Sequence, residues 1–222
     1  KPILHFATHN LLAFSKPVFD ALGNKVAIVE IVRHPLYMLI QQTLNQINLS
    51  KSYGSARQFH IYIKHGNQQV PFWNYGQEEL HLNSNPVEKA IYEMQKLTEL
   101  TENYKKQKFG ENDSRVLTIP FEHFVMDPRP YLKKVEDLLG SKISRKTERI
   151  IKNQKIPRKK ISDGIPLTIY KRCGWEAPVK GLTEENELEK RKEFAVKHGA
   201  SNNAILVLEK LSAKYEDQYL KK

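Results

Sequence analysis

Residues 26–42 read VAIVEIVRHPLYMLIQQ, and this stretch indicates the class of fold. Its first seven residues are apolar except for Glu30, and most are β-branched, which is typical of a strand covered on both faces. The apolar run ends at Arg33, and Pro35 then suits the first turn of a helix, where its missing N–H costs nothing. The stretch therefore predicts a buried strand, an arginine at its carboxyl end and a following helix.

The predicted position of Arg33 has two interpretations. In open α/β sheets, ligands bind in the crevice at the carboxyl ends of the strands, and a guanidinium there can clamp a phosphate or sulfate. Alternatively, Arg33 caps the edge of the sheet or pairs with a carboxylate. This stretch on its own does not separate the two, so Arg33 is a candidate anion ligand.

Composition narrows the class of protein. The 222 residues suffice for one sizeable α/β domain or two small ones, and 40% of them are hydrophobic. The net charge of +11 favours acidic partners such as nucleotides, nucleic acid, sulfated glycans or anionic membrane surfaces, unless it only solvates the surface. Cys173 is the only cysteine, which excludes an intramolecular disulfide and a cysteine-rich metal site. No apolar run approaches the roughly 20 residues of a membrane-spanning helix.

Strand patterns alternate with helix patterns along the chain, which predicts an α/β fold with a mainly parallel sheet flanked by helices, in one domain over residues 1–222. Residues 45–85 are polar, aromatic-bearing and poorly periodic, so we expect a substrate-facing insertion there. Within it, residues 59–63 are a candidate short strand. The strands are predicted at 3–7, 26–32 and 115–121, and the helices at 11–22, 36–42, 85–108, 127–140, 144–153, 184–197 and 203–219.

Residues 26–42 resemble the segment of sulfotransferases in which a strand ends in Arg-x-Pro and a helix follows. In that family the arginine, and a serine eight residues later, bind the 3′-phosphate of 3′-phosphoadenosine 5′-phosphosulfate (PAPS). Arg33 and Pro35 match this pattern, and Gln41 stands at the serine position. An amide can also donate to a phosphate, so the resemblance implies that Arg33 and Gln41 bind the cofactor.

Residues 116–140, VLTIPFEHFVMDPRPYLKKVEDLLG, are similar to a second stretch of the same family. That stretch is usually Tyr-Glu-Asp-Leu at a strand end, then Asp-Pro, then Phe-Leu-Gly. The residues that match this pattern in type and spacing are Phe121, Glu122, Phe124, Asp127, Pro128, Leu139 and Gly140. The match is a structural signature, and it implies the P-loop nucleotide-binding fold of the sulfotransferases. A buried side of the helix at 127–140 is predicted to carry Tyr131, Leu132, Val135, Leu138 and Leu139.

The sequence LHFATHN places Thr8 and His9 at the end of the first predicted strand. Cytosolic sulfotransferases carry a Thr-His at a similar place, and the resemblance implies that His9 is the general base on the acceptor hydroxyl. Sulfuryl transfer needs that hydroxyl deprotonated as it attacks, and histidine titrates near neutral pH. His5 is the second choice, other branches of the family use a glutamate elsewhere, and a hydrogen-bonded structural histidine is the alternative. We expect Glu30 to face a buried partner.

Lys171-Arg172-Cys173-Gly174-Trp175 is similar to the family's loop that closes over the 3′-phosphate, although the order differs and the aspartate is absent. The resemblance implies cofactor contacts from Lys171, Arg172 and Gly174. A second basic cluster precedes this loop. Either group could hold the cofactor's phosphates or an anionic substrate, or could be a solvated face. The second cluster comprises Lys155, Arg158, Lys159 and Lys160.

The predicted function is therefore transfer of a sulfuryl group from PAPS to a hydroxyl or amine, leaving adenosine 3′,5′-bisphosphate. The family's glycine- and serine-rich 5′-phosphosulfate loop is not present, and the resemblance places it upstream of Lys1. We expect the chain to be truncated at its N-terminus, and its activity to depend on that loop because backbone N–H groups there anchor the sulfate donor. Acceptor specificity is expected from residues 45–85, with Trp73, Tyr75, His60 and His65.

Two rival functions remain open. One is another nucleotide-handling enzyme of the same fold, such as a kinase. The other is a non-catalytic anion-binding protein, for nucleic acid or sulfated glycan. Basic residues occur along the whole chain without a basic-aromatic motif, which disfavours nucleic acid. No metal is expected, since the histidines lack a recognisable ligand spacing. A cytoplasmic location is predicted, or the Golgi lumen if a membrane anchor precedes Lys1.

Overall fold

A small parallel sheet connects the two motif segments. The computed structural model describes residues 12–51, 61–109, 114–161 and 182–221. In it, β1 (Ile28–Val32) pairs in parallel with β4 (Val116–Pro120), in a register that runs from Ile28 opposite Val116 to Val32 opposite Pro120. A second pair, β2 (Tyr62–His65) and β3 (Gln68–Pro71), is antiparallel. The chain is thus an α/β protein with mostly helices and a small parallel sheet, and the P-loop sulfotransferase arrangement stays a prediction.

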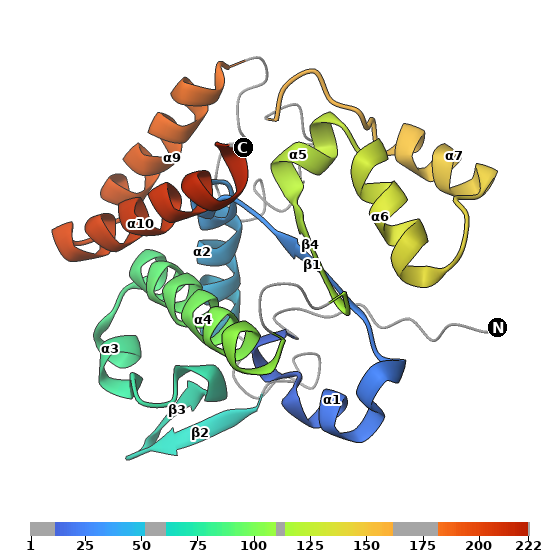
Figure 1. Ribbon diagram of the computed structural model, residues 1–222. Helices are drawn as coiled ribbons and strands as arrows, with labels where there is room; N and C mark the ends of the chain where they lie inside the picture. Colours follow the sequence, from blue (N-terminus) through green and yellow to red (C-terminus); the bar gives the residue numbers. More distant parts are fainter. Residues whose placement is uncertain (1–11, 52–60, 110–113, 162–181, 222) are drawn as a thin grey trace.

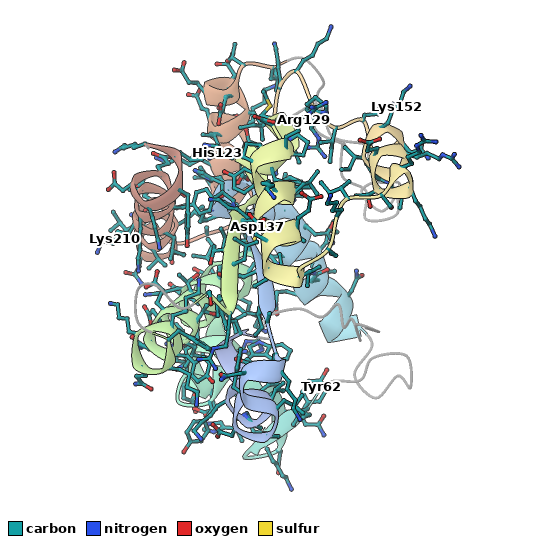
Figure 2. All side chains as sticks on the ribbon, turned by 45° about the vertical axis from the view of Figure 1, so that its right-hand side comes forward. Tyr62, His123, Arg129, Asp137, Lys152 and Lys210 are labelled. Atoms are coloured by element: carbon teal, nitrogen blue, oxygen red, sulfur yellow. The ribbon has the colours of Figure 1, made fainter. Side chains whose placement is uncertain are left out.

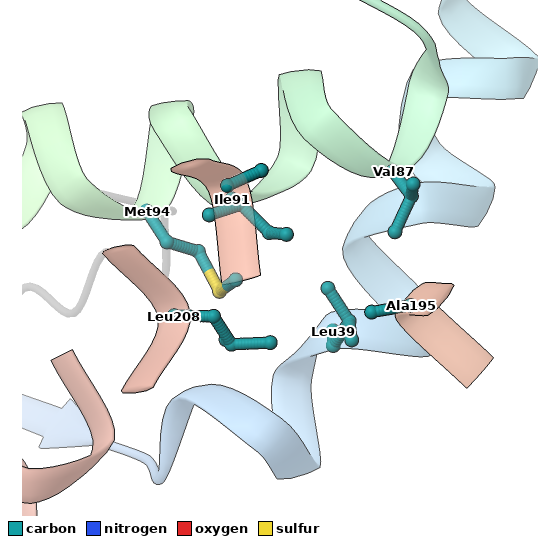
Figure 3. Packing of buried hydrophobic residues seen from close by; sticks show 7 residues of the cluster. Leu39, Val87, Ile91, Met94, Ala195 and Leu208 are labelled. Carbon is teal, nitrogen blue, oxygen red and sulfur yellow. The ribbon is translucent and has the colours of Figure 1, made fainter. Parts of the chain in front are cut away.

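The main hydrophobic core lies among four helices on one side of this sheet (Figure 1). They are α2 (Pro35–Lys51), α4 (Pro86–Lys108), α9 (Glu184–Lys197) and α10 (Asn202–Tyr215). Their buried side chains meet in the cluster drawn in Figure 3, which comprises Leu39, Val87, Ile91, Met94, Ala195, Ala204 and Leu208. Burial of such apolar area supplies most of the stabilisation of a domain, and it holds α2 in place behind the strand ends.

The start of α4 is a capping box that also makes tertiary contacts. Asn85 accepts from the backbone N–H groups of Val87 and Glu88, and the Glu88 carboxylate accepts from Asn85 N–H in return. The same side chains reach the turn between α9 and α10, since Asn85 Nδ2 donates to Gly199 O at 2.7 Å and Ser201 N–H donates to Glu88 Oε1 at 3.0 Å. One cap therefore fixes three helices.

The two faces of β1 differ. On one face, Glu30 forms an ion pair with Lys105 of α4 and accepts from the Thr118 hydroxyl at 2.8 Å, so the expected buried partner exists. On the other face, Val29 and Ile31 are 40% and 55% exposed. The prediction of a strand covered on both faces is therefore wrong. Among the described elements, α6 packs against the neighbouring strand β4.

Short elements replace several longer predicted ones. The helix expected over residues 11–22 is divided into η1 (Leu12–Phe14) and α1 (Lys16–Leu22), and η2 (Gly23–Lys25) leads into β1. In the predicted insertion, α2 continues to Lys51, and the β2–β3 hairpin, η3 (Phe72–Asn74) and α3 (Glu78–Asn83) follow. Gly66 makes the hairpin turn with a positive φ of 58°, which glycine adopts without strain.

Three helices follow β4, and Figure 1 shows them on the side of the sheet away from α4 and α9. They are α5 (Phe121–Met126), α6 (Arg129–Leu139) and α7 (Arg145–Asn153). Gly140 ends α6 in the left-handed conformation, as predicted. The predicted buried side of α6 is only partly covered, however, and Leu139 is 41% exposed.

The chain closes with η4 (Glu216–Leu220), a π-helical turn directly after α10. Within the described ranges, no helix combines the length and the apolar character needed to cross a lipid bilayer.

Candidate anion-binding site

The candidate site lies where β1 and β4 end. Because Val32 is the register partner of Pro120, the residues that follow, Arg33 and Phe121, leave the sheet side by side. The Arg33 Cζ atom lies 4.6 Å from the centre of the Phe121 ring, within the range of a cation–π contact. The Arg33 side chain stays 36% exposed. A solute can therefore reach a guanidinium that an aromatic ring holds in place.

A second arginine approaches the same ring from a distant part of the chain. Arg158 Cζ lies 5.4 Å from the Phe121 ring centre, and the Arg158 backbone N–H donates to Val125 O at 2.7 Å. The segment after α7 is therefore tied to α5, beside the strand ends. Phe121 thus has two guanidinium groups, Arg33 and Arg158, against its ring.

Glu122 is the buried carboxylate of this cluster. Its side chain is fully buried, and Oε1 lies 3.9 Å from Arg33 Nε. The carboxylate accepts from His34 N–H at 3.2 Å and from the Tyr215 hydroxyl at 2.5 Å. Burial, and then the charge of Glu122, raise the pKa of Tyr215 well above its ordinary value, so Tyr215 remains a donor.

His34 has both ring nitrogens engaged. Leu36 N–H donates to Nδ1 at 3.2 Å, so Nδ1 is the acceptor in this arrangement. Nε2 therefore donates to Glu216 Oε1, at 3.1 Å. The side chain is 1% exposed, so His34 joins β1 to the end of α10 as a structural hydrogen-bonded residue.

The N-terminus of α2 is capped internally. The N–H groups of Tyr37 and Met38 donate to His34 O, at 3.0 and 3.2 Å, and that of Leu36 donates to the His34 ring. Pro35 has no N–H to offer. Helix N-termini often bind anions through free N–H groups, but here these groups are used. An anion at this edge would therefore have to be bound by side chains.

Arg191 of α9 is a buried cation beside this edge that the sequence did not reveal. It pairs with Glu187 at 2.7 Å and donates to the carbonyl of Tyr37 at 3.2 Å, with its Cζ 5.0 Å from the Tyr37 ring centre. It is 6% exposed, and its contacts are internal, so it fixes α9 against α2. The one feature of the sequence that indicates this ion pair is the spacing of Glu187 and Arg191, which are four residues apart and so lie on the same face of a helix.

Of the residues that the sequence nominated, Arg33 and Arg158 come together at the strand ends. Gln41 lies on α2 and donates through Nε2 to Asn45 Oδ1 at 3.1 Å, along its own helix. The other nominated residues, His5, His9, Lys171, Arg172 and Gly174, lie outside the described residues. In the ranges that are described, histidine, cysteine and acidic side chains form no group of three suited to a metal ion.

The described part of the predicted acceptor region lies apart from this edge. Figure 1 shows the β2–β3 hairpin and α3 on the far side of α4 from α5. His65 Nε2 lies 2.8 Å from Glu79 Oε1, Tyr75 is 75% exposed, and Trp73 packs against Phe72. His60 lies outside the described residues. The role of this region in acceptor choice stays a prediction.

Comparison with known proteins returns no match, whether to a protein-family model, to a curated protein or to a solved structure. Function is therefore inferred from the site and from the two motifs.

Proposed function

We propose that the chain is a sulfotransferase domain, which transfers a sulfuryl group from PAPS to a hydroxyl or amine. One observation carries the proposal. Arg33, from the Arg-x-Pro segment, and Glu122, from the second motif, lie 3.9 Å apart at the ends of two paired parallel strands. The two motifs that the sequence matched separately thus meet at the edge of the sheet where α/β proteins bind ligands, which supports one shared site.

The residues of this edge suit a phosphate group. A terminal phosphate carries close to two negative charges, and guanidinium groups match its oxygens with paired N–H donors. Arg33 and Arg158 supply two such groups around Phe121, and the buried Glu122 carboxylate lies beside Arg33. We assign the 3′-phosphate to Arg33 and Arg158. Gln41, Lys171, Arg172 and Gly174 remain proposed further contacts to the cofactor.

Glu122 and Tyr215 have a positioning role in this account. Glu122 limits the positions open to the Arg33 side chain, and the Tyr215 hydroxyl in turn fixes the carboxylate. A cation held in place before the ligand arrives loses less conformational entropy on binding. PAPS supplies the activated sulfuryl group when bound. His9 is the proposed base that takes the proton from the acceptor, and a cytoplasmic location remains part of the proposal.

The experiment that tests the cofactor class is a calorimetric titration of the chain with adenosine 3′,5′-bisphosphate and, separately, with ATP. We expect saturable binding of the bisphosphate with a dissociation constant at least about tenfold lower than that of ATP, a difference of roughly 1.4 kcal/mol or more. Tighter binding of ATP would favour a kinase-like enzyme of the same fold. A folded sample that binds neither nucleotide would contradict a nucleotide site at Arg33.

A further inference from the structure

One short part of the chain carries most of its excess charge. Residues 142–160 include nine lysines and arginines and a single acidic residue, Glu148, which is a net charge of +8 out of +11 for the whole chain. Basic residues occur throughout the sequence, but elsewhere acidic residues nearly balance them, whereas in residues 142–160 they do not. The segment comprises α7 and the turns on either side of it, and every one of its basic side chains except Arg158 is exposed.

These cations are not neutralised locally. Some lysines elsewhere in the described chain pair with carboxylates, as Lys133 does with Asp137 and Lys214 with Glu102. Among the described residues, by contrast, seven cations of this segment form no ion pair: Lys142, Arg145, Lys146, Arg149, Lys152, Lys155 and Lys159. Like charges held close together raise the free energy of the folded protein unless counterions or a partner offset them. The segment is therefore an unusually strong positive surface.

The surface continues into the candidate site. α7 has no buried residue, and a helix of its nine residues is about 13 Å long. The chain then returns to the sheet, where Arg158 meets Phe121 and Val125. Figure 2 places Lys152 of α7 at the outer edge of the molecule and Lys210 of α10 on the opposite side. One cationic surface thus leads from the outer face of α7 towards Arg33.

We propose that this surface, residues 142–160, binds an acidic glycan chain bearing sulfate or carboxylate groups. The positive charge is extended over a helix and its flanking turns, so it fits a polymer with repeated anionic groups better than a single small anion. Residues 142–160 contain no aromatic side chain. Single-stranded nucleic acids are usually held by bases stacked on aromatic rings interleaved with cations, so the composition favours a glycan.

The surface adjoins the proposed cofactor site, so the bound glycan could be the sulfuryl acceptor, and this identification rests on the proposed function. The claim that the surface binds a glycan is independent of the proposed function. The test therefore measures glycan binding and nucleotide binding separately.

The probe is a fluorescently labelled heparin octasaccharide, titrated with the full chain by anisotropy at several salt concentrations. The test variant is Lys146→Gln, Arg149→Gln and Lys152→Gln together. The control is Lys190→Gln, Lys197→Gln and Lys210→Gln, which removes the same charge from exposed positions on α9 and α10. We expect the α7 variant to bind at least about tenfold more weakly, with the slope of log K against log salt reduced by about two. The control should stay within about twofold of the wild type.

Three outcomes would overturn the inference. Equal losses in both variants would mean that only net charge matters. Unchanged binding in the α7 variant would show that the glycan binds elsewhere. Tighter binding of a single-stranded DNA of equal charge, lost in the α7 variant, would make this a nucleic-acid surface. If heparin binding behaves as expected while adenosine 3′,5′-bisphosphate does not bind, the glycan surface stands and the proposed function fails.

Discussion

At the scale of single residues, Arg33 takes one of the two roles that the sequence left open, and we propose that it also takes the other, anion binding. It does face a carboxylate, but the 3.9 Å between Nε and Glu122 Oε1 is longer than a direct hydrogen bond, and the side chain is 36% exposed. A tight internal pair would bury the guanidinium. The loose pair and the ring contact with Phe121 instead hold the cation at the strand ends with its side chain partly exposed.

A residue away from the site makes the stability depend on pH. His81 of α3 is 6% exposed and is hydrogen-bonded to Asn74 at 3.2 Å. Burial, and to a smaller extent the charge of Lys89, lower the pKa of His81 to about 4. The folded protein therefore disfavours the charged imidazole. The stabilisation is complete above the ordinary pKa of about 6.5 and is lost as the pH falls from there towards 4.

We expect the wild type to lose about 2 kcal/mol more of its free energy of unfolding between pH 7 and pH 4.5 than the His81→Gln variant does. Urea denaturation at the two pH values measures both. His65→Gln is the control for the loss of a histidine at an exposed position, since His65 is 40% exposed. An equal decline in the wild type and in His81→Gln would show that His81 does not carry this pH dependence.

At the scale of elements, the junction of α10 and η4 is tied to the ends of both strands. Tyr215 donates to Glu122 after β4, and Glu216 accepts from His34 after β1. Two consecutive residues therefore link the end of the chain to the candidate site. Figure 1 shows the C-terminus close to the point where β1 leads into α2.

Tyr215→Phe should destabilise the protein by about 1–3 kcal/mol, because the fully buried Glu122 loses a donor that water cannot replace. Chemical denaturation followed by circular dichroism measures the change. Tyr75→Phe is the matched control, since Tyr75 is 75% exposed and its hydroxyl is hydrated. A Tyr215→Phe variant as stable as the control would mean that the hydrogen bond to Glu122 contributes nothing.

Helices that carry a capping residue or a regular apolar spacing, such as α4, were predictable from the sequence. The second half of α2 was not. The cap at Asn85 and the apolar spacing along α4 are local, and both are confirmed. The second half of α2 was expected to be irregular because its buried side is partly polar. Thr43 donates to Leu39 O at 2.8 Å, and Gln46 donates to Glu93 at 2.7 Å. Thr43 is satisfied within its own helix, whereas Gln46 is satisfied by Glu93 of α4, a tertiary partner that no sequence period records.

At the scale of the whole molecule, the candidate site depends on the register between distant segments. The sequence identified Arg33 and listed Arg158 as one of several cations, but it did not place them on the same ring. That placement follows from the pairing of Val32 with Pro120 and from the return of the chain after α7. Long-range pairing of this kind is set by burial across the whole fold, so local patterns do not reveal it.

The central claim is that Arg33 binds the 3′-phosphate of the cofactor. The most direct measurement compares the affinities for adenosine 3′,5′-bisphosphate and adenosine 5′-monophosphate, by calorimetry, in the wild type, Arg33→Gln and Arg115→Gln. Arg115 is a matched control, since it also lies against aromatic rings, those of Phe19 and Phe109, but just before β4 begins. The wild type and Arg115→Gln should prefer the bisphosphate by about tenfold or more, and Arg33→Gln should lose that preference. An Arg33→Gln variant that keeps the full preference would contradict the claim.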